Sequence, residues 1–364
     1  MRKSQIAKLR LVNQQIAGTK FSDPAELVSW LGAVQAQDYA MAKWAIGLRL
    51  NHATEKTVEA AIDSGSIVRT HVMRPTWHFV AAEDIRWMLE LTATRIRSAC
   101  GSWKRHLELD DTTIAKSNSI IAKALEGGKH LTRSELMTEL ERYGIKTDPG
   151  RAGYLMLEAE VEGIVCNGRR RGKQFTYSLL DETVPNTAKL NKEAALAKLA
   201  ERYFASHGPA TLADFAWWSG LSAADVATAH GLIKPKLISE KIDEKVYWMS
   251  NSISTTKLLT KSVHLLSSFD EFTISYKDRS ASVAPELMKD ITVGHAIFRP
   301  IIVVDGQVVG IWKRVIKKDR AIIEAELILR SKNVDTKSIE KAALGYSSFE
   351  EQKCHLVCSS KIPD

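Results

Sequence analysis

The sequence predicts an α+β protein in which three tandem winged-helix units precede a C-terminal β-rich domain. A helix-rich segment followed by strand, turn and strand recurs three times up to residue 250, and short strands and turns dominate afterwards. Helices followed by a two-stranded wing define a winged helix. A length of 364 residues fits two to four such units. We therefore place winged helices at residues 1–110, 111–182 and 183–250, and the β-rich domain at 251–364.

Charge and composition limit the class of protein. Hydrophobic residues at 45% and charged residues at 26% are ordinary globular values. The 51 lysines and arginines exceed the 43 acidic residues, and the net charge of +8 favours a polyanionic partner. We see no apolar segment of signal-peptide or membrane-spanning length. We therefore expect a cytoplasmic monomer with no membrane partner.

The cysteines and the common cofactor motifs predict neither disulfides nor a metal. Four widely scattered cysteines in such a chain favour reduced thiols. Cys354, Leu356 and Cys358 would share one face of a strand, which indicates core packing and not a zinc site. The sequence contains no Gly-rich phosphate loop, zinc-protease motif or nucleophile elbow. We expect no cofactor and no metal.

The first unit contains the pattern Gln35-Ala-Gln37. A helix begins at Asp23-Pro24 with a capping residue and a first-turn proline, and its buried stripe extends to Val34. Residues two apart on a helix point ~200° apart, so the two glutamines serve one site only where the helix ends or distorts. We expect a site at a helix terminus. Glutamine is also a common helix residue, so an ordinary structural role stays open.

The wing of the first unit alternates in polarity. A turn near residues 74–75 would gather four polar side chains on one face of the hairpin, namely Arg69, His71, Thr76 and His78. The alternative is a strand pair whose histidines make ordinary hydrogen bonds. Both interpretations stay open from the residues alone.

The second unit has the clearest boundaries. Helices are expected at residues 117–125, 132–143 and 148–162, with Thr132 and Glu135 forming a capping box and Asp148-Pro149 starting the third. The following wing spans residues 165–177, and its tip holds Arg169, Arg170, Arg171 and Lys173. Such a tip suits contact with DNA phosphates. The alternative is a solvated hairpin turn.

The third unit and the β-rich domain complete the prediction. Helices at residues 211–218 and 222–230 precede a hairpin ending at Met249. Strands are expected at residues 263–266, 297–304, 308–312, 322–329 and 354–357, with a helix at 338–347. Asp305-Gly306 is a two-residue hairpin signal. We interpret this region as a small α/β or barrel-like domain packed against the winged helices.

Several of these segments together resemble the winged-helix DNA glycosylases typified by AlkZ. The resemblance rests on Gln35-Ala-Gln37, on residues 69–79, on Ser268-Phe-Asp270 and the segment to Arg279, and on residues 304–312. The motif is similar to that of the AlkZ-like branch, whereas the more distant YcaQ branch has an acidic residue at the position of Gln37. The chain departs from many members at Pro75, where they have glycine.

The resemblance implies an activity and a set of site residues. It implies a monofunctional glycosylase that acts on cationic alkylated purines in double-stranded DNA, including interstrand crosslinks, with Gln35 and Gln37 as catalytic residues. A glutamine amide does not titrate, so it orients water or stabilises positive charge. Arg69, Arg74 and His78 would fix the hairpin and contact the DNA backbone, and the DNA-binding residues expected on this hairpin are Arg69, His71, Arg74, Thr76 and His78. Asp38 is a rival carboxylate or the cap of the next segment.

Two other classes of function stay open at this point. A winged-helix DNA-binding protein or transcription regulator would bind DNA with a sequence preference and would not need the glutamines. An interaction scaffold would have no affinity for DNA. A fold that hosts many functions does not decide among these classes by itself.

Overall fold

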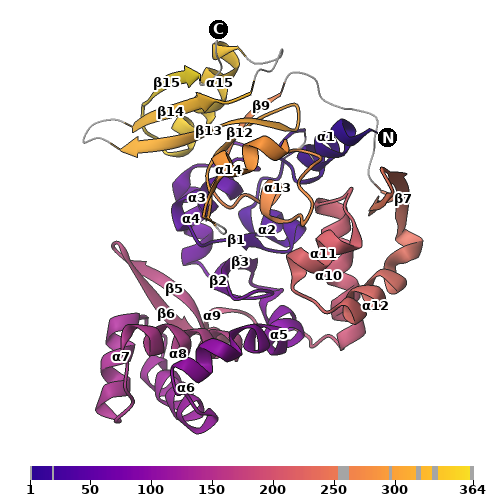
Figure 1. The fold of residues 1–364 in the computed structure, drawn as a ribbon. Helices are drawn as coiled ribbons and strands as arrows, with labels where there is room; N and C mark the ends of the chain where they lie inside the picture. Colours follow the sequence, from indigo (N-terminus) through magenta and orange to yellow (C-terminus); the bar gives the residue numbers. More distant parts are fainter. Residues whose placement is uncertain are drawn as a thin grey trace.

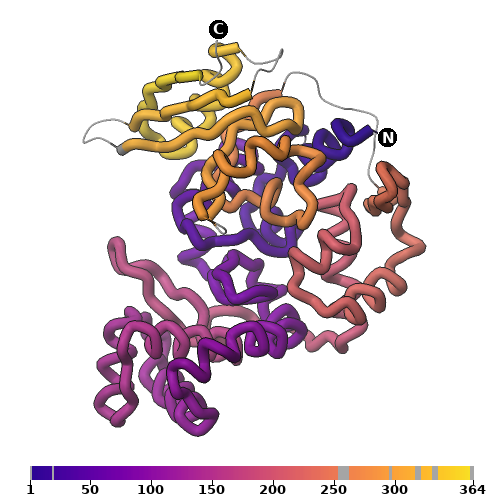
Figure 2. The backbone as a smooth tube through the Cα atoms, in the orientation of Figure 1, coloured from indigo at the N-terminus to yellow at the C-terminus, as the bar shows by residue number. Residues whose placement is uncertain are grey.

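The computed structural model describes residues 2–18, 20–252, 262–294, 297–316, 321–329 and 335–360. The first helix–hairpin unit lies in the centre, with the second unit below it, the third beside it, and the β-rich region above (Figure 1). The same arrangement is visible in the backbone trace (Figure 2). The predicted α+β class, with helix-rich units followed by a β-rich region, is confirmed.

The first unit surrounds a three-stranded sheet of order β1-β3-β2. After α1 (Lys3–Asn13), its elements are α2 (Pro24–Leu31), β1 (Val34–Gln35), α3 (Tyr39–Gly47), α4 (Glu55–Asp63), β2 (Ile67–His71) and β3 (Trp77–Ala81). Asp23 caps α2 as predicted, accepting from the Glu26 amide. The helix does not reach Val34, because Gly32 at φ +80° ends it. The chain then enters the sheet.

In the second unit the predicted helix ends agree to within one residue, except that its first predicted helix begins at Asp111 and not at residue 117. The unit also includes a long helix from residues 1–110, which the sequence assigned to the first unit. Its elements are α5 (Ile85–His106), α6 (Asp111–Leu125), β4 (Leu131–Thr132), α7 (Arg133–Arg142), α8 (Pro149–Val161), β5 (Val165–Arg171), β6 (Gln174–Leu179) and α9 (Leu180–Thr183). The capping box of Thr132 and Glu135 is present, and Asp148 caps α8. Local capping chemistry therefore sets these helix ends.

The third unit repeats the helix–hairpin pattern. It comprises α10 (Lys192–Ser206), α11 (Leu212–Ser219), α12 (Ala223–Ile233), the short 3₁₀ helix η1 (Lys234–Lys236), β7 (Leu237–Ile242) and β8 (Lys245–Ser250). Thr211 and Ser222 cap α11 and α12, at the predicted starts of these helices.

The β-rich region contains an open five-stranded sheet of order β15-β14-β13-β12-β9, so the barrel-like alternative is wrong. The strands are β9 (Val263–Leu266), β12 (Ile301–Val304), β13 (Gln307–Ile316), β14 (Ala321–Leu327) and β15 (Cys354–Ser360). The predicted strand at 297–304 is two strands, because β11 (Ile297–Phe298) pairs with β10 (Thr292–Val293) instead. Asp305-Gly306 forms the predicted hairpin, with both residues at positive φ.

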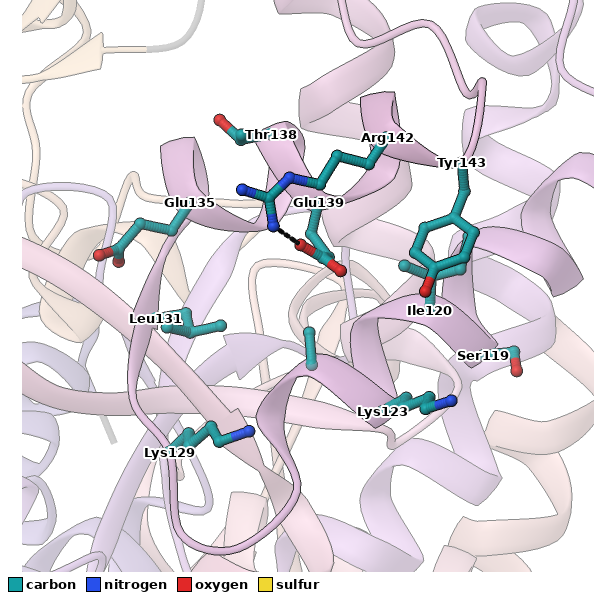
Figure 3. A pocket seen from close by; sticks show the side chains of 11 residues that line it. Ser119, Ile120, Lys123, Lys129, Leu131, Glu135, Thr138, Glu139, Arg142 and Tyr143 are labelled. Atoms are coloured by element: carbon teal, nitrogen blue, oxygen red, sulfur yellow. Dashed lines mark hydrogen bonds and ion pairs between the residues drawn. The ribbon is translucent and has the colours of Figure 1, made fainter.

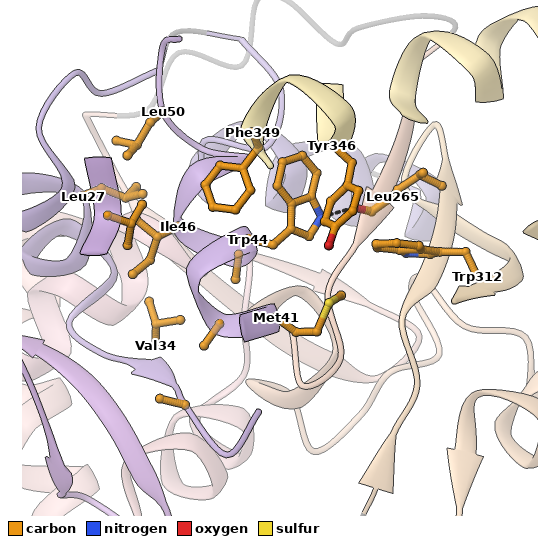
Figure 4. Packing of buried hydrophobic residues seen from close by; sticks show 14 of the residues in the cluster. Leu27, Val34, Met41, Trp44, Ile46, Leu50, Leu265, Trp312, Tyr346 and Phe349 are labelled. Carbon is orange, nitrogen blue, oxygen red and sulfur yellow. Dashed lines mark hydrogen bonds between the residues drawn. The ribbon is translucent and has the colours of Figure 1, made fainter. Parts of the chain in front are cut away.

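The helical elements of this region hold it against the first unit. They are α13 (Glu271–Ile274), η2 (Pro285–Leu287), α14 (Met288–Ile291) and α15 (Thr336–Phe349). Tyr346 and Phe349 of α15 pack on Trp44 of α3, whose indole donates to the Leu265 carbonyl at 2.8 Å (Figure 4). Glycine is required at position 47, because a Cβ there would lie 2.2 Å from the Phe349 ring.

The buried cores connect the units unequally. One hydrophobic core joins the first unit to the β-rich region, and another joins it to the third unit. The second unit has a core largely of its own. The first, third and β-rich parts thus form one packed body. The second unit joins it where β5 and α8 contact β2 and where α5 contacts α10.

Two sequence-based expectations about cysteines and membranes can be compared with the structure. The four cysteines are free, and Cys100 and Cys166 are buried. Core packing is wrong for Cys358, which is exposed on β15. Among the described helices, none combines the length and the apolar character needed to cross a membrane.

Candidate active site

The two glutamines lie at the end of a strand and not on a helix. Gln35 is the last residue of β1, and Gln37 precedes Asp38, which caps α3 through the Met41 amide. The prediction of a helix terminus is therefore correct only for the start of α3. The backbone of Ala36 is fixed between two partners, since its amide donates to the Trp77 carbonyl and its carbonyl accepts from Arg69.

The register of the hairpin corrects the predicted polar face. Arg69 pairs with Phe79 and His71 with Trp77, so these four side chains share one face of the sheet. His78 instead shares the opposite face with its strand neighbours Thr70 and Gln35. A turn displaced by one residue exchanges the two faces of a strand, which is why the four predicted residues do not converge.

Both glutamine amides have a fixed orientation. The Trp77 backbone N–H donates to Gln37 Oε1 at 3.1 Å, and Arg74 Nη2 donates to Gln35 Oε1 at 3.2 Å. A peptide N–H and a guanidinium can only donate, so each oxygen must face its donor and each amide nitrogen must point elsewhere. Gln37 is exposed and Gln35 is 8% exposed. Gln37 is therefore the more accessible of the two glutamines.

A buried carboxylate supports the backbone of the motif. Glu271 Oε1 accepts from the backbone N–H of Gln35 at 2.8 Å, while Oε2 accepts from Trp218 Nε1 at 3.2 Å and from Ser275 Oγ. Burial opposes ionisation, but the adjacent His207 ring and the hydrogen bonds from Ser275 and Gln35 outweigh it and lower the pKa of Glu271 to about 2. The β-rich region thus places an anion directly behind Gln35.

The remaining polar residues of the hairpin are mostly buried. Burial, with the Arg74 charge nearby, lowers the pKa of His78 to about 3, so its ring is neutral. His78 is fully buried, and a direct DNA contact for it is wrong. His71 Nδ1 lies 2.5 Å from Glu160 of α8, which ties the hairpin to the second unit. The hydroxyl of Thr76 is buried without a hydrogen-bond partner among the described residues.

Gln37 opens onto a cleft between three parts of the molecule. The cleft has a volume of about 650 Å³. The first unit contributes Gln37, Asp38, Tyr39, Ala40, Lys43, Glu55 and Arg69, the second unit Arg170 and Phe175, and the β-rich region Arg314 and Glu350. Asp38 has both carboxylate oxygens occupied, one by the Met41 amide and one by Ser268 Oγ. Its expected capping role is confirmed.

The three arginines of the wing differ in the contacts that their side chains make within the protein. Arg169 Nε donates to the Asp63 carbonyl, and Arg171 bonds Glu135 and the His130 carbonyl. Arg170 lies in the cleft beside Tyr39 and Phe175. Lys173 is exposed at the tip. The arginines therefore brace the wing as well as carrying charge.

Another large hollow lies far along the second unit, between α6 and α7. It has a volume of about 720 Å³, with Lys123, Lys129 and Tyr143 on its rim and an ion pair between Arg142 and Glu139 (Figure 3). It contains none of the predicted site residues. In the part of the chain that is described, no three His, Cys, Asp or Glu residues are grouped to hold a metal ion.

Sequence reasoning missed three residues that shape this site. Glu271 belongs to a segment noted only for its resemblance, and its partner Gln35 is 236 positions away. Tyr39 lies two residues after Gln37, and Phe175 lies within the noted basic wing. An aromatic residue among wing arginines was the available signal for Phe175.

Three comparisons agree with this architecture. The family model described as "DNA glycosylase AlkZ-like" matches residues 28–349. A protein of Streptomyces sahachiroi named "Interstrand DNA cross-link repair glycosylase" is 24% identical over 93% of this chain and 94% of its own length. The solved structure of Streptomyces sahachiroi DNA glycosylase AlkZ superposes with a TM-score of 0.82 at 20% identity, covering 99% of this chain and 100% of that one.

The fold and the family match together define a DNA glycosylase. The chain belongs to the AlkZ-like family of DNA glycosylases. Among the three classes of function left open by the residues, the comparisons favour the enzyme over the regulator and the scaffold.

Proposed function

We propose that the protein hydrolyses the N-glycosidic bond of cationic alkylated purines in double-stranded DNA, with Gln37 as the residue that acts on the reacting sugar. The observation that carries this proposal is the position of Gln37, which is exposed on the cleft while its oxygen is anchored by the Trp77 amide. An anchored amide is a preorganised dipole, which stabilises developing charge without reorganisation during the reaction.

The chemistry matches a labile bond. A purine alkylated at N3 or N7 is cationic and leaves as a neutral base, so the reaction needs no general acid. What remains is to position water and to stabilise the oxocarbenium sugar. Gln37 does this through the free lone pair and N–H groups of its amide, and Gln35, held by Arg74 and Glu271, orients it.

The basic residues around the cleft supply the DNA contacts. Arg170 and Lys173 face the cleft or solvent and approach the phosphates, with Arg169 and Arg171 adding charge from the braced wing. Arg69 lines the same cleft but is only 7% exposed, and its guanidinium holds the Ala36 carbonyl. His71, Arg74, Thr76 and His78 hold the hairpin in place. No cofactor takes part in this scheme. One copy of the chain contains all of these groups, so the protein acts as a monomer. It acts on DNA in the cytoplasm.

Crosslinked substrates follow from the relative. The matching protein of Streptomyces sahachiroi is named for interstrand cross-link repair, and we extend that substrate to this chain. A crosslinked purine stays tethered to the opposite strand, so it cannot rotate fully into a pocket as in ordinary base flipping. An open cleft with Gln37 at its surface suits such a base, because the enzyme reaches into the duplex.

Base release from two substrates tests this proposal. Duplexes carry either N7-methylguanine or a nitrogen-mustard crosslink, and Asp38→Asn serves as the comparison with Gln37→Ala. We expect wild-type protein to release base from both duplexes, and Asp38→Asn to retain more activity than Gln37→Ala. If Asp38→Asn alone abolished release, Asp38 and not Gln37 would be the catalytic residue. Release from the monoadduct alone would remove crosslinks from the proposal.

A further inference from the structure

Phe175 is an exposed aromatic ring on the wing of the second unit. It lies on β6 among charged residues and is 36% exposed. It belongs to none of the hydrophobic clusters formed by the described residues. The hairpin of β5 and β6 extends from the second unit toward α3 and α4 (Figure 1). This reach brings Phe175 into the same cleft as Gln37.

The surroundings of Phe175 alternate rings and guanidinium groups. Arg69 lies 4.4 Å from the Trp77 ring centre and 5.0 Å from that of Phe175. Arg170 lies 5.3 Å from Phe175 and 5.2 Å from Tyr39, whose ring meets Phe175 edge-on with centroids 4.9 Å apart. The result is a cluster of flat groups that line the cleft, namely Tyr39, Arg69, Arg170 and Phe175.

Flat rings and guanidinium planes are the groups on which proteins stack displaced nucleobases. Every base has a π-face, so such stacking tolerates any sequence. Arg170 is partly exposed, and its ion pair with Glu59 is long, at 3.8 Å. A base can therefore lie against Phe175 while the Arg170 charge stays near the backbone. A volume of about 650 Å³ is within the range of ligand-binding clefts.

We propose that Phe175 and Arg170 form a stacking subsite that takes one nucleobase displaced from the duplex next to the reacting nucleotide. This inference rests on the proposed function, because it places the subsite beside Gln37. The wing of the second unit then has a role in recognition in addition to its phosphate contacts. Stacking accounts for an apolar ring at the tip of a wing that is otherwise basic.

Binding measurements separate stacking from charge. Duplex carrying N7-methylguanine is titrated onto Gln37→Ala protein, whose slow release of base leaves the substrate intact during the titration, with and without Phe175→Leu. We expect Phe175→Leu to weaken binding about ten- to hundredfold and Phe175→Trp to restore it. The slope of log Kd against log salt should stay unchanged, because no phosphate contact is lost. Tyr143→Leu, an exposed aromatic elsewhere in the same unit, is the matched control.

A fluorescent base reports displacement directly. 2-Aminopurine is placed opposite the lesion and at each flanking position, and its emission is compared between variants. We expect a change on binding at one of these positions, lost in Phe175→Leu and kept in Phe175→Trp. Equal emission and equal Kd for Phe175→Leu and its parent would overturn the subsite. A weaker Kd for Phe175→Leu with an altered salt slope would show that the ring only docks the wing, which also overturns it.

Different results would contradict the stacking subsite and the proposed function. Wild-type base release with unaltered binding by Phe175→Leu removes only the stacking subsite. Binding and base displacement without base release by wild type would contradict the proposed function and leave the subsite in place.

Discussion

At the scale of single residues, the site is held by groups that can act only as hydrogen-bond donors or only as hydrogen-bond acceptors. Trp77 N–H and the Arg74 guanidinium fix the two glutamine amides because neither can accept a hydrogen bond. Glu271 fixes the backbone of Gln35 from behind as an acceptor. The orientation of the motif is thus determined by complementary donors and acceptors, and the hydrogen bond that orients Gln37 Oε1 comes from a backbone N–H.

Replacing Glu271 should lower the stability of the fold. In Glu271→Ala the Gln35 amide and the Trp218 indole N–H lose a buried acceptor, at a cost of about 1–3 kcal/mol for each group. We expect the free energy of unfolding in urea to fall by about 2–5 kcal/mol. Glu286→Ala, which removes an exposed glutamate of the same region, should unfold like wild type. Equal stability of Glu271→Ala and Glu286→Ala would contradict the supporting role.

At the scale of elements, local signals were predictable from sequence and non-local pairing was not. The capping residues of α7 and α8 and the Asp305-Gly306 turn depend on a few neighbouring residues, so their positions were predicted. The strand β1 depends on pairing with β3, more than 40 residues later, and the sequence before Gln35 has the period of a helix. The register of the β2–β3 hairpin was also beyond reach, because a shift of one residue exchanges its faces.

The β5–β6 wing carries a prediction about salt. Lys173 is exposed at the tip, whereas Arg171 is held by Glu135 and the His130 carbonyl. Replacing Lys173 with alanine should lower the slope of log Kd against log salt by about 0.9 if it contacts one phosphate. Lys189→Ala, outside the wing, is the comparison. An unchanged slope for Lys173→Ala would mean that the tip does not touch DNA.

At the scale of the whole molecule, a buried ion pair fastens the first unit to the β-rich region. Arg49 and Asp270 are fully buried, with bonds of 3.0 and 2.7 Å between guanidinium and carboxylate. Neither residue was predicted as a partner of the other, because 221 positions separate them. Because these partners lie so far apart in the chain, the sequence predicted both regions but not how they pack together around the cleft.

Removing one partner of this ion pair should lower the free energy of unfolding more than removing both partners. Asp270→Ala leaves Arg49 as an unpaired buried charge and should destabilise the fold by about 3–5 kcal/mol. The double variant Arg49→Met/Asp270→Ala should lose less than the sum of the two single variants. Urea unfolding of all four proteins measures the coupling. Additive losses would show that the two charges stabilise the molecule independently.

Acid should weaken the whole fold through its buried groups. Burial lowers the pKa of His78 to about 3 and that of His264 to about 4, from an ordinary 6.5. The unfolded chain therefore binds more protons below pH 6.5, and stability falls as the pH drops. Each histidine contributes about 1.4 kcal/mol per pH unit, and Glu271, with a pKa of about 2, adds to the loss below pH 4.5. Urea midpoints that stay constant from pH 7 to pH 4 would contradict this sign.

In the proposed mechanism, Gln37 acts on the glycosidic bond from the cleft. Its most direct test is single-turnover release of free base from duplex DNA containing N7-methylguanine, by wild type and by Gln37→Ala, with duplex affinity measured alongside. We predict release by wild type, and release about 100-fold slower by Gln37→Ala at unchanged affinity. Release at the wild-type rate by Gln37→Ala, or tight DNA binding without any release by wild type, would contradict the account.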